Sequence, residues 1–251
     1  MTTYNFQNKI AVVTGASSGV GAAAARQLAQ AGARLVLVGR DAERLAATVR
    51  DAESDGASVE AVNADLADDS SFARVADAAG GLGGVDAVMH CAALFGVGTL
   101  ADASPASIDL LWRVNARAPM LLTRALLPHL RENSAIAFVS STVAHGGFAG
   151  YAPYSATKGA VEAFSRALAM ELAPRTRVNV LAPGFIETPM LTNQYADAPQ
   201  LGDWVSEQTP LKFIGSADDL AQSLLMLCCP ETSRYITGTV LVSDGGWTAR
   251  G

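Results

Sequence analysis

The sequence predicts an α/β fold in which residues 1–251 form a single domain around one doubly wound, mostly parallel sheet of seven strands, with helices on both faces. Two observations support this fold. Short runs rich in β-branched residues alternate with longer amphipathic segments, which is the order of a parallel sheet with helical crossovers. Several short runs, such as residues 10–13 and 35–38, are apolar at nearly every position, as expected for strands that helices cover on both faces.

Strands and helices are expected to alternate along the chain. The first strand ends in a glycine-rich turn that leads into the first helix, and the later strands are again short apolar runs separated by longer amphipathic segments. The expected strands are residues 9–14, 33–38, 58–63, 85–91, 135–140, 177–181 and 239–242. The expected helices include residues 21–31, 41–55, 105–130, 154–172 and 218–227.

Composition and charge argue against several classes of protein. Half of the residues are hydrophobic and 17% are charged, which indicates a folded globular chain. The net charge of −6 and the scattered basic residues argue against nucleic acid as a partner. No apolar stretch reaches the length of a membrane span, and no secretory signal is visible. The three cysteines fit neither a disulfide framework nor a zinc site, so we expect a cytoplasmic protein without a metal.

A glycine-rich turn follows the first expected strand. Residues 14–21 read Thr-Gly-Ala-Ser-Ser-Gly-Val-Gly and lead directly into a helix. Glycines at such a turn permit a tight bend, close approach of the backbone to a pyrophosphate and close packing of the helix on the sheet. The helix N-terminus then offers unpaired N–H groups and the positive end of its dipole to the phosphates. The turn therefore predicts a dinucleotide site with contacts from Gly15, Ser17, Ser18, Gly19, Val20 and Gly21.

The end of the second strand, Val38-Gly39-Arg40-Asp41, bears on the choice of cofactor. An acidic side chain here would bond the 2′-hydroxyl of an adenosine ribose, whereas a basic one accommodates a 2′-phosphate. Gly39 carries no carboxylate and Arg40 offers a planar guanidinium suited to phosphate, so NADP is favoured over NAD. Two alternatives stay open: Asp41 could be the partner of the ribose, and Arg40 could merely cap a surface turn.

Tyr154 and Lys158 stand four residues apart. On a helix this spacing puts both side chains on one face, one turn apart. Ser141 lies upstream at the end of an apolar run, so a phenol, an ammonium and a hydroxyl can converge on one pocket and transfer a proton. Ser140 and Tyr151 are the neighbouring alternatives. The strand should point Ser140 to the opposite face, and only Tyr154 has a lysine four residues on.

These motifs, in this order over essentially the whole chain, resemble the single-domain form of the short-chain dehydrogenase/reductase family, which has a Rossmann fold. The family's Thr-Gly-x-x-x-Gly-x-Gly matches residues 14–21, and its Tyr-x-x-x-Lys matches Tyr154 and Lys158. The resemblance implies an NAD(P)-dependent oxidoreductase whose catalytic residues are Asn115, Ser141, Tyr154 and Lys158. It also implies that the cofactor is contacted by Tyr154, Lys158, Asp65, Leu66, Pro183, Gly184, Ile186 and Thr188, of which Asp65 lies beside the adenine.

One motif departs from the family. The family's Asn-Asn-Ala-Gly after the fourth strand reads His90-Cys91-Ala92-Ala93 in this chain. That segment chiefly supports the sheet and the cofactor cleft, so the departure does not exclude catalysis, although it alters the local hydrogen bonds. His90 could be recruited to the chemistry, but a histidine inside an apolar strand is more often a core residue.

The expected chemistry is a proton transfer at a carbonyl oxygen. Tyr154 would protonate this oxygen as hydride reaches the carbon, and would remove the proton in the reverse direction. The Lys158 ammonium is expected to lower the pKa of Tyr154, and Ser141 would bond the same oxygen and orient it. By the family resemblance, Lys158 also binds the nicotinamide ribose, and Asn115 holds a water that links Lys158 to solvent.

The long segment 185–210 is expected to form a lid over the substrate, with a fixed surface excursion as the alternative. It carries Pro189, Tyr195, Pro199, Trp204 and Pro210. Together with Leu94, Phe95, His145 and Phe148 it would make a mostly apolar pocket. The expected substrate contacts are Ser141, His145, Phe148, Tyr154 and Phe185.

Three functions are compatible with these residues. The favoured one is an NADPH-dependent reductase of a ketone or a 3-oxoacyl thioester. The second is an NAD-dependent dehydrogenase of an alcohol, a sterol or a sugar. The third is a non-catalytic dinucleotide-sensing protein, which the presence of all four catalytic residues argues against. The family resemblance further implies a homotetramer packed through helices 105–130 and 154–172.

Overall fold

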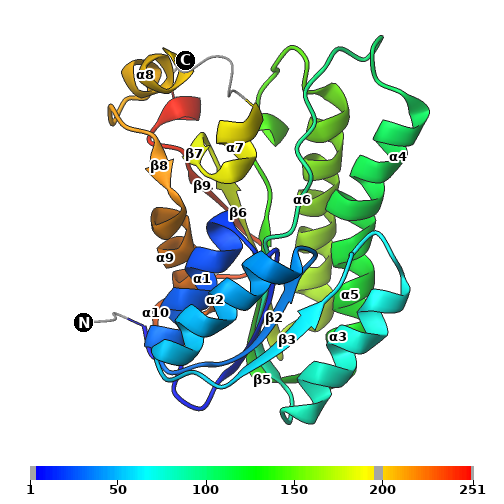
Figure 1. Cartoon of the computed structure of the whole chain (residues 1–251), viewed down its shortest axis with the longest axis vertical. Coiled ribbons are helices and arrows are strands. Elements are labelled where there is room, and N and C mark those ends of the chain that lie inside the picture. Colours follow the sequence, from blue (N-terminus) through cyan, green and yellow to red (C-terminus); the bar gives the residue numbers. More distant parts are fainter. Residues whose placement is uncertain (1–3, 195–199, 250–251) are drawn as a thin grey trace.

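The computed structural model describes residues 4–194 and 200–249, and it has the expected doubly wound α/β architecture (Figure 1). Seven strands form one sheet in the order β3-β2-β1-β4-β5-β6-β9, and all neighbouring strands in it are parallel. The strand order reverses beside β1, as in a Rossmann fold. The strands are β1 (Ile10–Thr14), β2 (Arg34–Gly39), β3 (Val59–Asn63), β4 (Val85–His90), β5 (Leu130–Val139), β6 (Thr176–Pro183) and β9 (Val240–Ser243).

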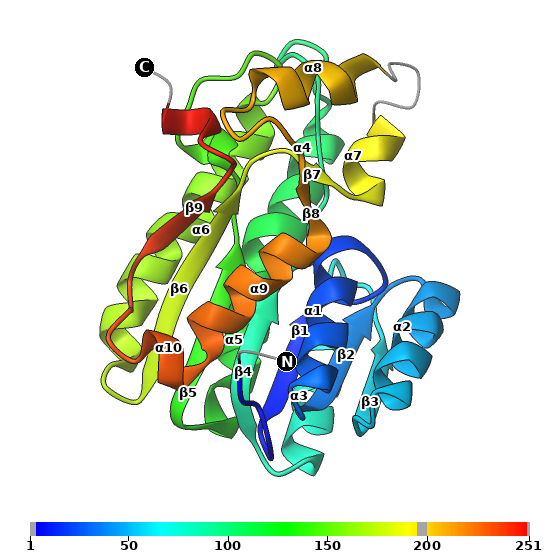
Figure 2. The same ribbon diagram turned by 90° about the vertical axis from the view of Figure 1, so that its left-hand side faces the viewer.

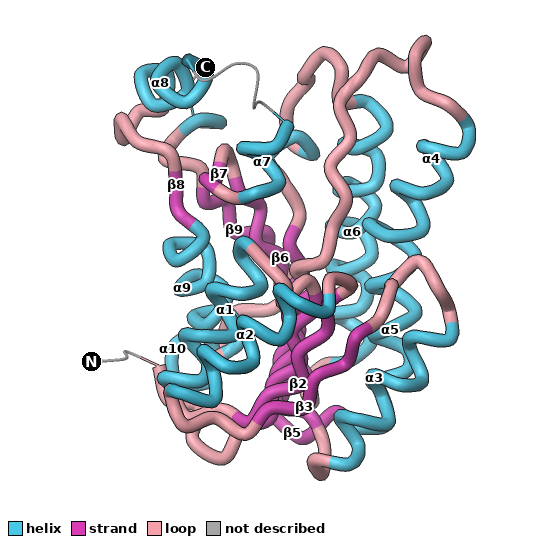
Figure 3. The backbone as a smooth tube through the Cα atoms, viewed as in Figure 1, coloured by secondary structure: helices cyan, strands magenta, loops and turns pink. Residues whose placement is uncertain are grey.

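Helices cover both faces of this sheet (Figures 2 and 3). One face carries α1 (Gly19–Gln30), α2 (Ala42–Ser54) and α9 (Ala217–Cys228), and the other carries α3 (Ser70–Gly81), α5 (Ala118–Leu126) and α6 (Ala152–Leu172). The remaining helices are α4 (Pro105–Trp112), α7 (Pro189–Gln194), α8 (Gln200–Gln208) and α10 (Pro230–Ser233). Within the described residues, no helix is both long and apolar enough to span a bilayer.

The apolar runs of the sequence are explained by burial on both faces of the sheet. Ala11 and Val13 of β1 pack in the core under α1, α2 and α9, while Val12 between them packs in the core under α3, α5 and α6. All three side chains are 0% exposed. Because burial of a valine contributes about 1.5–3 kcal/mol, a polar residue is disfavoured on either face of this strand.

The segment 105–130 is not one helix, so the sequence prediction is wrong at this point. α4 leads into a π-helical turn, Arg113–Arg117, before α5 begins. Pro119 has no N–H to donate to the carbonyl of Asn115 as an α-helix requires, and the wider turn accommodates this loss. Leu130 is the first residue of β5 rather than the end of a helix.

Other differences from the sequence prediction are smaller. α6 begins two residues earlier than expected, at Ala152, and β6 is longer than expected at both ends. The structure also has elements that the sequence did not single out. These are α3, α7, α8, α10 and a two-stranded parallel sheet of β7 (Ile186–Glu187) and β8 (Gly215–Ser216).

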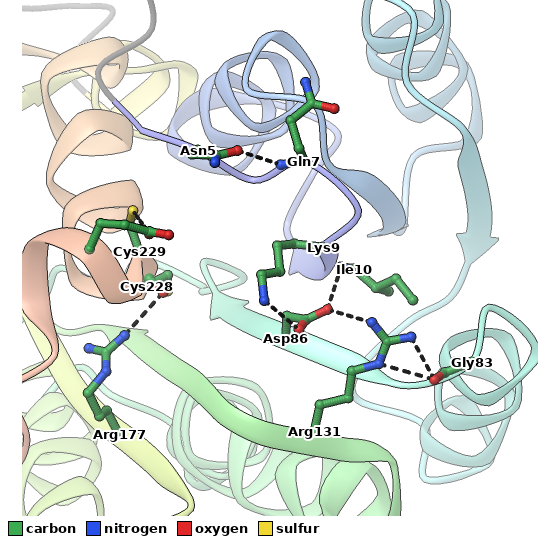
Figure 4. Close-up of polar contacts among 11 residues, drawn as sticks. Asn5, Gln7, Lys9, Ile10, Gly83, Asp86, Arg131, Arg177, Cys228 and Cys229 are labelled. Atoms are coloured by element: carbon green, nitrogen blue, oxygen red, sulfur yellow. Dashed lines mark hydrogen bonds and ion pairs between the residues drawn. The ribbon is translucent and has the colours of Figure 1, made fainter.

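The amino ends of three strands are joined by one buried carboxylate, that of Asp86 in β4 (Figure 4). Its Oδ2 accepts hydrogen bonds from the backbone N–H of Ile10 at 2.9 Å and from Nη1 of Arg131 at 3.0 Å. Its Oδ1 lies 3.4 Å from the ammonium of Lys9, and the side chain is only 11% exposed. Arg131 also donates to the carbonyl oxygen of Gly83. This cluster holds β1, β4 and β5 together at the end of the sheet opposite their carboxyl ends.

Candidate active site

A cleft of about 320 Å³ lies at the carboxyl ends of the strands. Ligands of doubly wound sheets bind at this edge, where the strand order reverses. The cleft contains nearly all the site residues that the sequence predicts. They are Gly15, Ser17, Ser18, Gly19, Val20, Gly21, Arg40, Asp65, Leu66, Ser141, Phe148, Tyr154, Lys158, Pro183, Gly184, Phe185, Ile186 and Thr188.

The glycine turn between β1 and α1 has the geometry of a phosphate cradle. Gly15 and Gly19 have φ of +68° and +54°, a region that side chains with a Cβ rarely adopt. A Cβ on Gly15 would lie 2.8 Å from the backbone nitrogen of Ala92, and a Cβ on Gly21 would lie 2.4 Å from the carbonyl oxygen of Gly15. The N-cap residue Ser18 makes no side-chain cap, so the first turn of α1 keeps its N–H groups for a ligand. The residues present therefore fit the pyrophosphate of a dinucleotide.

The end of β2 is basic, and the carboxylate that directly follows it, that of Asp41, already has hydrogen-bond partners. Asp41 is the N-cap of α2: its Oδ1 accepts from the backbone N–H of Arg44 at 3.0 Å, and its Oδ2 pairs with Nε of Arg44 at 2.8 Å. The backbone N–H of Arg44 holds the pKa of Asp41 below its usual value. Arg40 and Arg44 both line the cleft and are exposed. Sequence reasoning missed Arg44, although a basic residue four positions after Arg40 on a helix that starts at Asp41 was a visible signal.

Tyr154, Ser141 and Lys158 meet where β5 ends and α6 begins. The Tyr154 and Ser141 hydroxyls are hydrogen-bonded. The Lys158 ammonium donates to the carbonyl oxygen of Val139 at 3.0 Å and lies 5.5 Å from the centroid of the Tyr154 ring. The edge of the Phe95 ring packs against Tyr154, with centroids 5.2 Å apart. The α-helical spacing read from the sequence thus brings a phenol and an ammonium to one buried site.

The pKa of Tyr154 is raised, not lowered as the sequence analysis expected. Burial disfavours the phenolate and raises this pKa, and the hydrogen bond from Ser141 opposes the rise. Burial also lowers the pKa of Lys158 to about 8. The expectation was wrong because it counted the ammonium charge and left out the cost of taking both groups from water. At neutral pH the isolated protein therefore holds Tyr154 as a neutral phenol.

Asn115 does not line the cleft. It lies in the π-helical turn, where its Oδ1 accepts from the backbone N–H of Leu94 at 2.7 Å and its Nδ2 donates to the carbonyl oxygen of Leu94 at 2.8 Å. Its Nδ2 also lies 3.3 Å from the hydroxyl of Thr157 on α6. Asn115 therefore joins the segment after β4 to α6, and Leu94 and Phe95 of that segment line the cleft. Its role in holding a water stays a prediction.

Ser140 and Ser141 both line the cleft, but their hydroxyls have different partners. The Ser141 hydroxyl is bonded to Tyr154, whereas the Ser140 hydroxyl donates to Oε1 of Glu162 at 2.8 Å. His145 is also bonded to Glu162, with Nε2 2.9 Å from Oε1 and 3.1 Å from Oε2. His145 does not line the cleft, because the buried carboxylate takes up its ring nitrogen, and its contact with substrate stays a prediction.

His90 is a core residue and takes no part in the cleft. Its Nε2 is 2.9 Å from the hydroxyl of Thr123, and its ring stacks on Phe138 with centroids 4.7 Å apart. Burial lowers the pKa of His90 to about 3, so the ring is neutral at physiological pH. The segment after His90 is held by β1 instead. The hydroxyl of Thr14 accepts hydrogen bonds from the backbone N–H groups of Cys91 and Ala92, each at 3.1 Å.

The expected lid is partly described. α7 and α8 lie at the top of Figures 1 and 2, beyond the carboxyl ends of the strands. Pro189, Met190 and Leu191 line the cleft. The Trp204 ring of α8 packs on Trp247 near the C-terminus, with centroids 5.9 Å apart, and Trp247 packs on Phe185 of the cleft. Tyr195 and Pro199 fall outside the described residues.

A phosphate-binding turn on a doubly wound sheet, beside a buried tyrosine, serine and lysine, defines the class of dinucleotide-dependent oxidoreductases. A family model described as enoyl-(acyl carrier protein) reductase matches residues 15–248. The dehydrogenase/reductase SDR family member 4 of Sus scrofa is 34% identical over 249 residues, covering 97% of this chain and 88% of that protein. The 2-(R)-hydroxypropyl-CoM dehydrogenase of Xanthobacter autotrophicus is 36% identical over 255 residues, covering 96% and 99%.

Solved structures agree with these sequence relatives. A short-chain dehydrogenase from Burkholderia cenocepacia in complex with NADP is 34% identical with a TM-score of 0.89, covering 97% of this chain and 99% of that one. A glucose/ribitol dehydrogenase from Brucella melitensis is 33% identical with a TM-score of 0.91, covering 97% and 98%. The chain belongs to the short-chain dehydrogenase/reductase family, and it is an oxidoreductase.

Proposed function

We propose that this protein is an NADPH-dependent reductase that converts an uncharged, hydrophobic ketone into a secondary alcohol. The observation that carries the proposal is a neutral phenol, Tyr154, hydrogen-bonded to Ser141 inside an apolar cleft that continues to the glycine turn. A bound nicotinamide dinucleotide would supply the hydride. The residues around Tyr154 bind and orient the carbonyl and supply the proton.

The protonation state of Tyr154 supports the reductive direction. A carbonyl oxygen that gains negative charge needs a proton donor within hydrogen-bond reach, and a phenol whose pKa is raised by burial is protonated at neutral pH. The Ser141 hydroxyl donates its single proton to Tyr154 in the isolated protein and would turn it to the carbonyl oxygen when a substrate is bound. Lys158 adds a positive charge one helical turn away, which favours loss of the Tyr154 proton at the moment of transfer.

The preference for NADPH rests on the end of β2. Both oxygens of the Asp41 carboxylate already accept bonds from Arg44, so this side chain is poorly suited to bind a ribose 2′-hydroxyl. Arg40 and Arg44 line the same end of the cleft and would hold the 2′-phosphate through guanidinium hydrogen bonds. Asp65 and Leu66 would lie against the adenine.

The walls around Tyr154 favour a hydrophobic substrate. The Phe95 ring packs on Tyr154, Tyr151 packs on Phe95, and Phe148 packs on Tyr151, with ring centroids 5.2–6.2 Å apart. Among the cleft residues that the structure describes, the other charged side chains lie at the β2 and β3 end, which leaves Lys158 as the charged group beside Tyr154. Relatives named versicolorin reductase and tropinone reductase-like 3, 31% and 30% identical, are compatible with a ketone of this kind. A 3-oxoacyl thioester is the second candidate, favoured by the description of the matching family model.

Cofactor preference is tested with initial rates for NADPH and NADH and with the double variant Arg40→Ala/Arg44→Ala. Loss of two charge-assisted bonds to phosphate should raise the KM for NADPH about 10- to 100-fold while changing the KM for NADH less than about 3-fold. Arg50→Ala, an exposed arginine on the same helix, is the matched control. A wild-type preference for NADH, or equal losses with both cofactors, would contradict the proposal.

The reaction is tested with a panel of aromatic ketones, aliphatic ketones and 3-oxoacyl thioesters, followed by nicotinamide absorbance. Tyr154→Phe removes the proton donor and should lower kcat at least about 100-fold while leaving cofactor binding within about 2-fold. Near-normal turnover by a Tyr154→Phe enzyme that binds cofactor would overturn the assignment. Absence of turnover on the whole panel, in either direction and with either cofactor, would favour a sensing role.

The assembly is proposed to be a homotetramer. α4 and α6 lie side by side in Figure 1, and they expose large apolar side chains: Leu110 (45%), Trp112 (42%) and Met170 (77%). Exposed apolar residues on neighbouring helices are typical of an interface. Light scattering coupled to size exclusion should give four times the chain mass of 25.9 kDa, and a monomer would refute this point.

A further inference from the structure

Glu162 is a buried carboxylate on the same face of α6 as Tyr154 and Lys158. It follows Lys158 by four residues and Tyr154 by eight, so the three side chains project from successive turns. Only 6% of Glu162 is exposed. A carboxylate is costly to bury unless it is fully hydrogen-bonded, and neither the proton transfer nor the cofactor cradle described above uses this one.

The Glu162 carboxylate contacts both ends of one loop. Residues 140–145, called the serine loop below, connect β5 to the segment before α6. At one end the Ser140 hydroxyl donates to Oε1 of Glu162 at 2.8 Å, and at the other end His145 Nε2 lies 2.9 and 3.1 Å from the two carboxylate oxygens. Ser141 and a 3-10 turn, Thr142–Ala144, lie between these two points.

The first residues of the serine loop have further contacts with α6: the Ser140 hydroxyl lies 3.4 Å from the carbonyl oxygen of Lys158, and Ser141 is bonded to Tyr154. The first residue of the loop is also fixed through its backbone, because the N–H of Ser140 donates to the carbonyl oxygen of Leu181 on β6. The last residue, His145, has its N–H bonded within the loop, to the carbonyl oxygen of Thr142. Among the hydrogen bonds of the described residues, those between His145 and Glu162 tie the far end of the loop to α6.

We propose that Glu162 is a positioning residue for catalysis: it clamps the serine loop onto α6 and so holds the Ser141 hydroxyl in line with Tyr154. The proposal rests on the proposed reduction of a ketone, since Ser141 acts on the carbonyl oxygen. The direction of the Ser141 hydroxyl depends on the loop backbone, whose two ends the carboxylate fixes. A displacement of about 1 Å at such a group costs on the order of 100-fold in rate.

The test compares five variants with the wild type, one of them the double variant Glu162→Ala/His145→Ala. Glu162→Ala breaks both contacts and should lower kcat about 10- to 100-fold with the dissociation constant for NADPH within about 2-fold. Glu162→Gln should recover most of the lost activity, because its amide oxygen can accept from Ser140 and its NH₂ can donate to the other tautomer of His145. His145→Ala breaks one end alone and should have little further effect in a Glu162→Ala background. Glu171→Ala, an exposed glutamate on the same helix, is the matched control.

Hydrogen exchange supplies a readout that does not need a substrate. Backbone amides of the serine loop should exchange faster in Glu162→Ala than in the wild type or in Glu171→Ala. If Glu162→Ala does not fold, His145→Ala tests the same clamp from its partly exposed end, since 27% of that side chain is exposed.

The outcomes separate the clamp from the proposed function. If the wild type reduces ketones while Glu162→Ala and His145→Ala keep wild-type kcat and loop exchange, the clamp is wrong and the function stands. If the wild type turns over no substrate, the proposed function fails, and loop exchange alone decides whether Glu162 holds the loop. Equal loss of activity in Glu162→Ala and Glu162→Gln, with unchanged loop exchange, would also overturn the clamp.

Discussion

The buried histidine of β4 makes the stability of this protein depend on pH in a way that can be calculated. His90 is 5% exposed, bonded to the hydroxyl of Thr123 and stacked on Phe138. Burial lowers its pKa to about 3 from an ordinary value of 6.5. Below pH 6.5 the unfolded chain takes up a proton at His90 and the folded protein does not, so stability is lost as the pH falls from 6.5 towards 3.

The size of this loss follows from the two pKa values. At about pH 5, protonation of His90 stabilises the unfolded state relative to the folded state by about 2 kcal/mol. Each pH unit below the unfolded pKa of His90 lowers the free energy of unfolding by about 1.4 kcal/mol. Against a typical stability of about 5–15 kcal/mol for the whole domain this loss is large. Replacement of His90 by Asn keeps a polar side chain and removes the titrating ring, so the variant should lack this contribution to acid sensitivity.

Urea unfolding at about pH 7.5 and about pH 5 measures the effect, because the difference between the two conditions cancels any change in baseline stability. The wild type should lose about 2 kcal/mol more than His90→Asn between the two conditions. His129→Asn is the matched control, since it removes another imidazole, and it should behave as the wild type. Equal losses in the wild type and in His90→Asn would mean that His90 is protonated in the folded protein, and would refute the argument from burial.

Three further predictions concern the cradle, the sheet and the proton donor. Gly21→Ala should weaken NADPH binding at least about 100-fold in a fluorescence titration, because the new Cβ would meet the backbone of Gly15. Gly81→Ala is the control and should bind NADPH as the wild type does, because its new Cβ meets nothing within 4 Å. Equal NADPH affinities of Gly21→Ala and the wild type would contradict the phosphate cradle. Asp86→Ala should lower the free energy of unfolding in urea by about 2–4 kcal/mol, because it leaves the Ile10 N–H unpaired. A loss no larger than that caused by replacing an exposed residue would contradict the role of Asp86. The kcat/KM for ketone reduction should fall as the pH rises through about 8, where Lys158 loses its proton, and a profile flat to pH 10 would contradict this.

The sheet could be predicted from the sequence because burial on both faces leaves a strong pattern. The runs of β1 and β2 are apolar except for Thr14 at the end of β1 and Arg34 at the start of β2, so their pattern does not resemble that of an amphipathic helix. The start of β5 could not be predicted, because Arg131, Glu132 and Asn133 are polar and partly or fully exposed, and Asn133 has a φ of +61°. The π-helical turn was hidden for a similar reason: Pro119 permits the first turn of a helix as well as the interruption of a longer one.

The meeting of Tyr154, Lys158 and Ser141 could be predicted because these residues share one helix face or lie at a strand end. Tyr154 and Lys158 need only the helical period, and Ser141 needs only strand alternation. The partners of buried polar groups could not be predicted, because they depend on how distant segments pack. Glu162 was visible as an acidic residue one turn after Lys158, but nothing in the sequence shows that it takes up His145. The pKa of Tyr154 was wrongly predicted for the same reason, since burial is a property of the whole fold.

The Asp86 cluster and the cleft lie at opposite ends of the same sheet. The cluster fixes β1, β4 and β5 at their amino ends, while the cleft is built from the loops at their carboxyl ends. Mutations in the loops can alter substrate choice, and mutations around Lys9 and Arg131 can raise stability. Because the two sets of residues lie far apart, their effects on the free energy of unfolding should add independently. A lineage evolving toward a new substrate can therefore regain lost stability at the amino ends of the strands without changing the residues at their carboxyl ends.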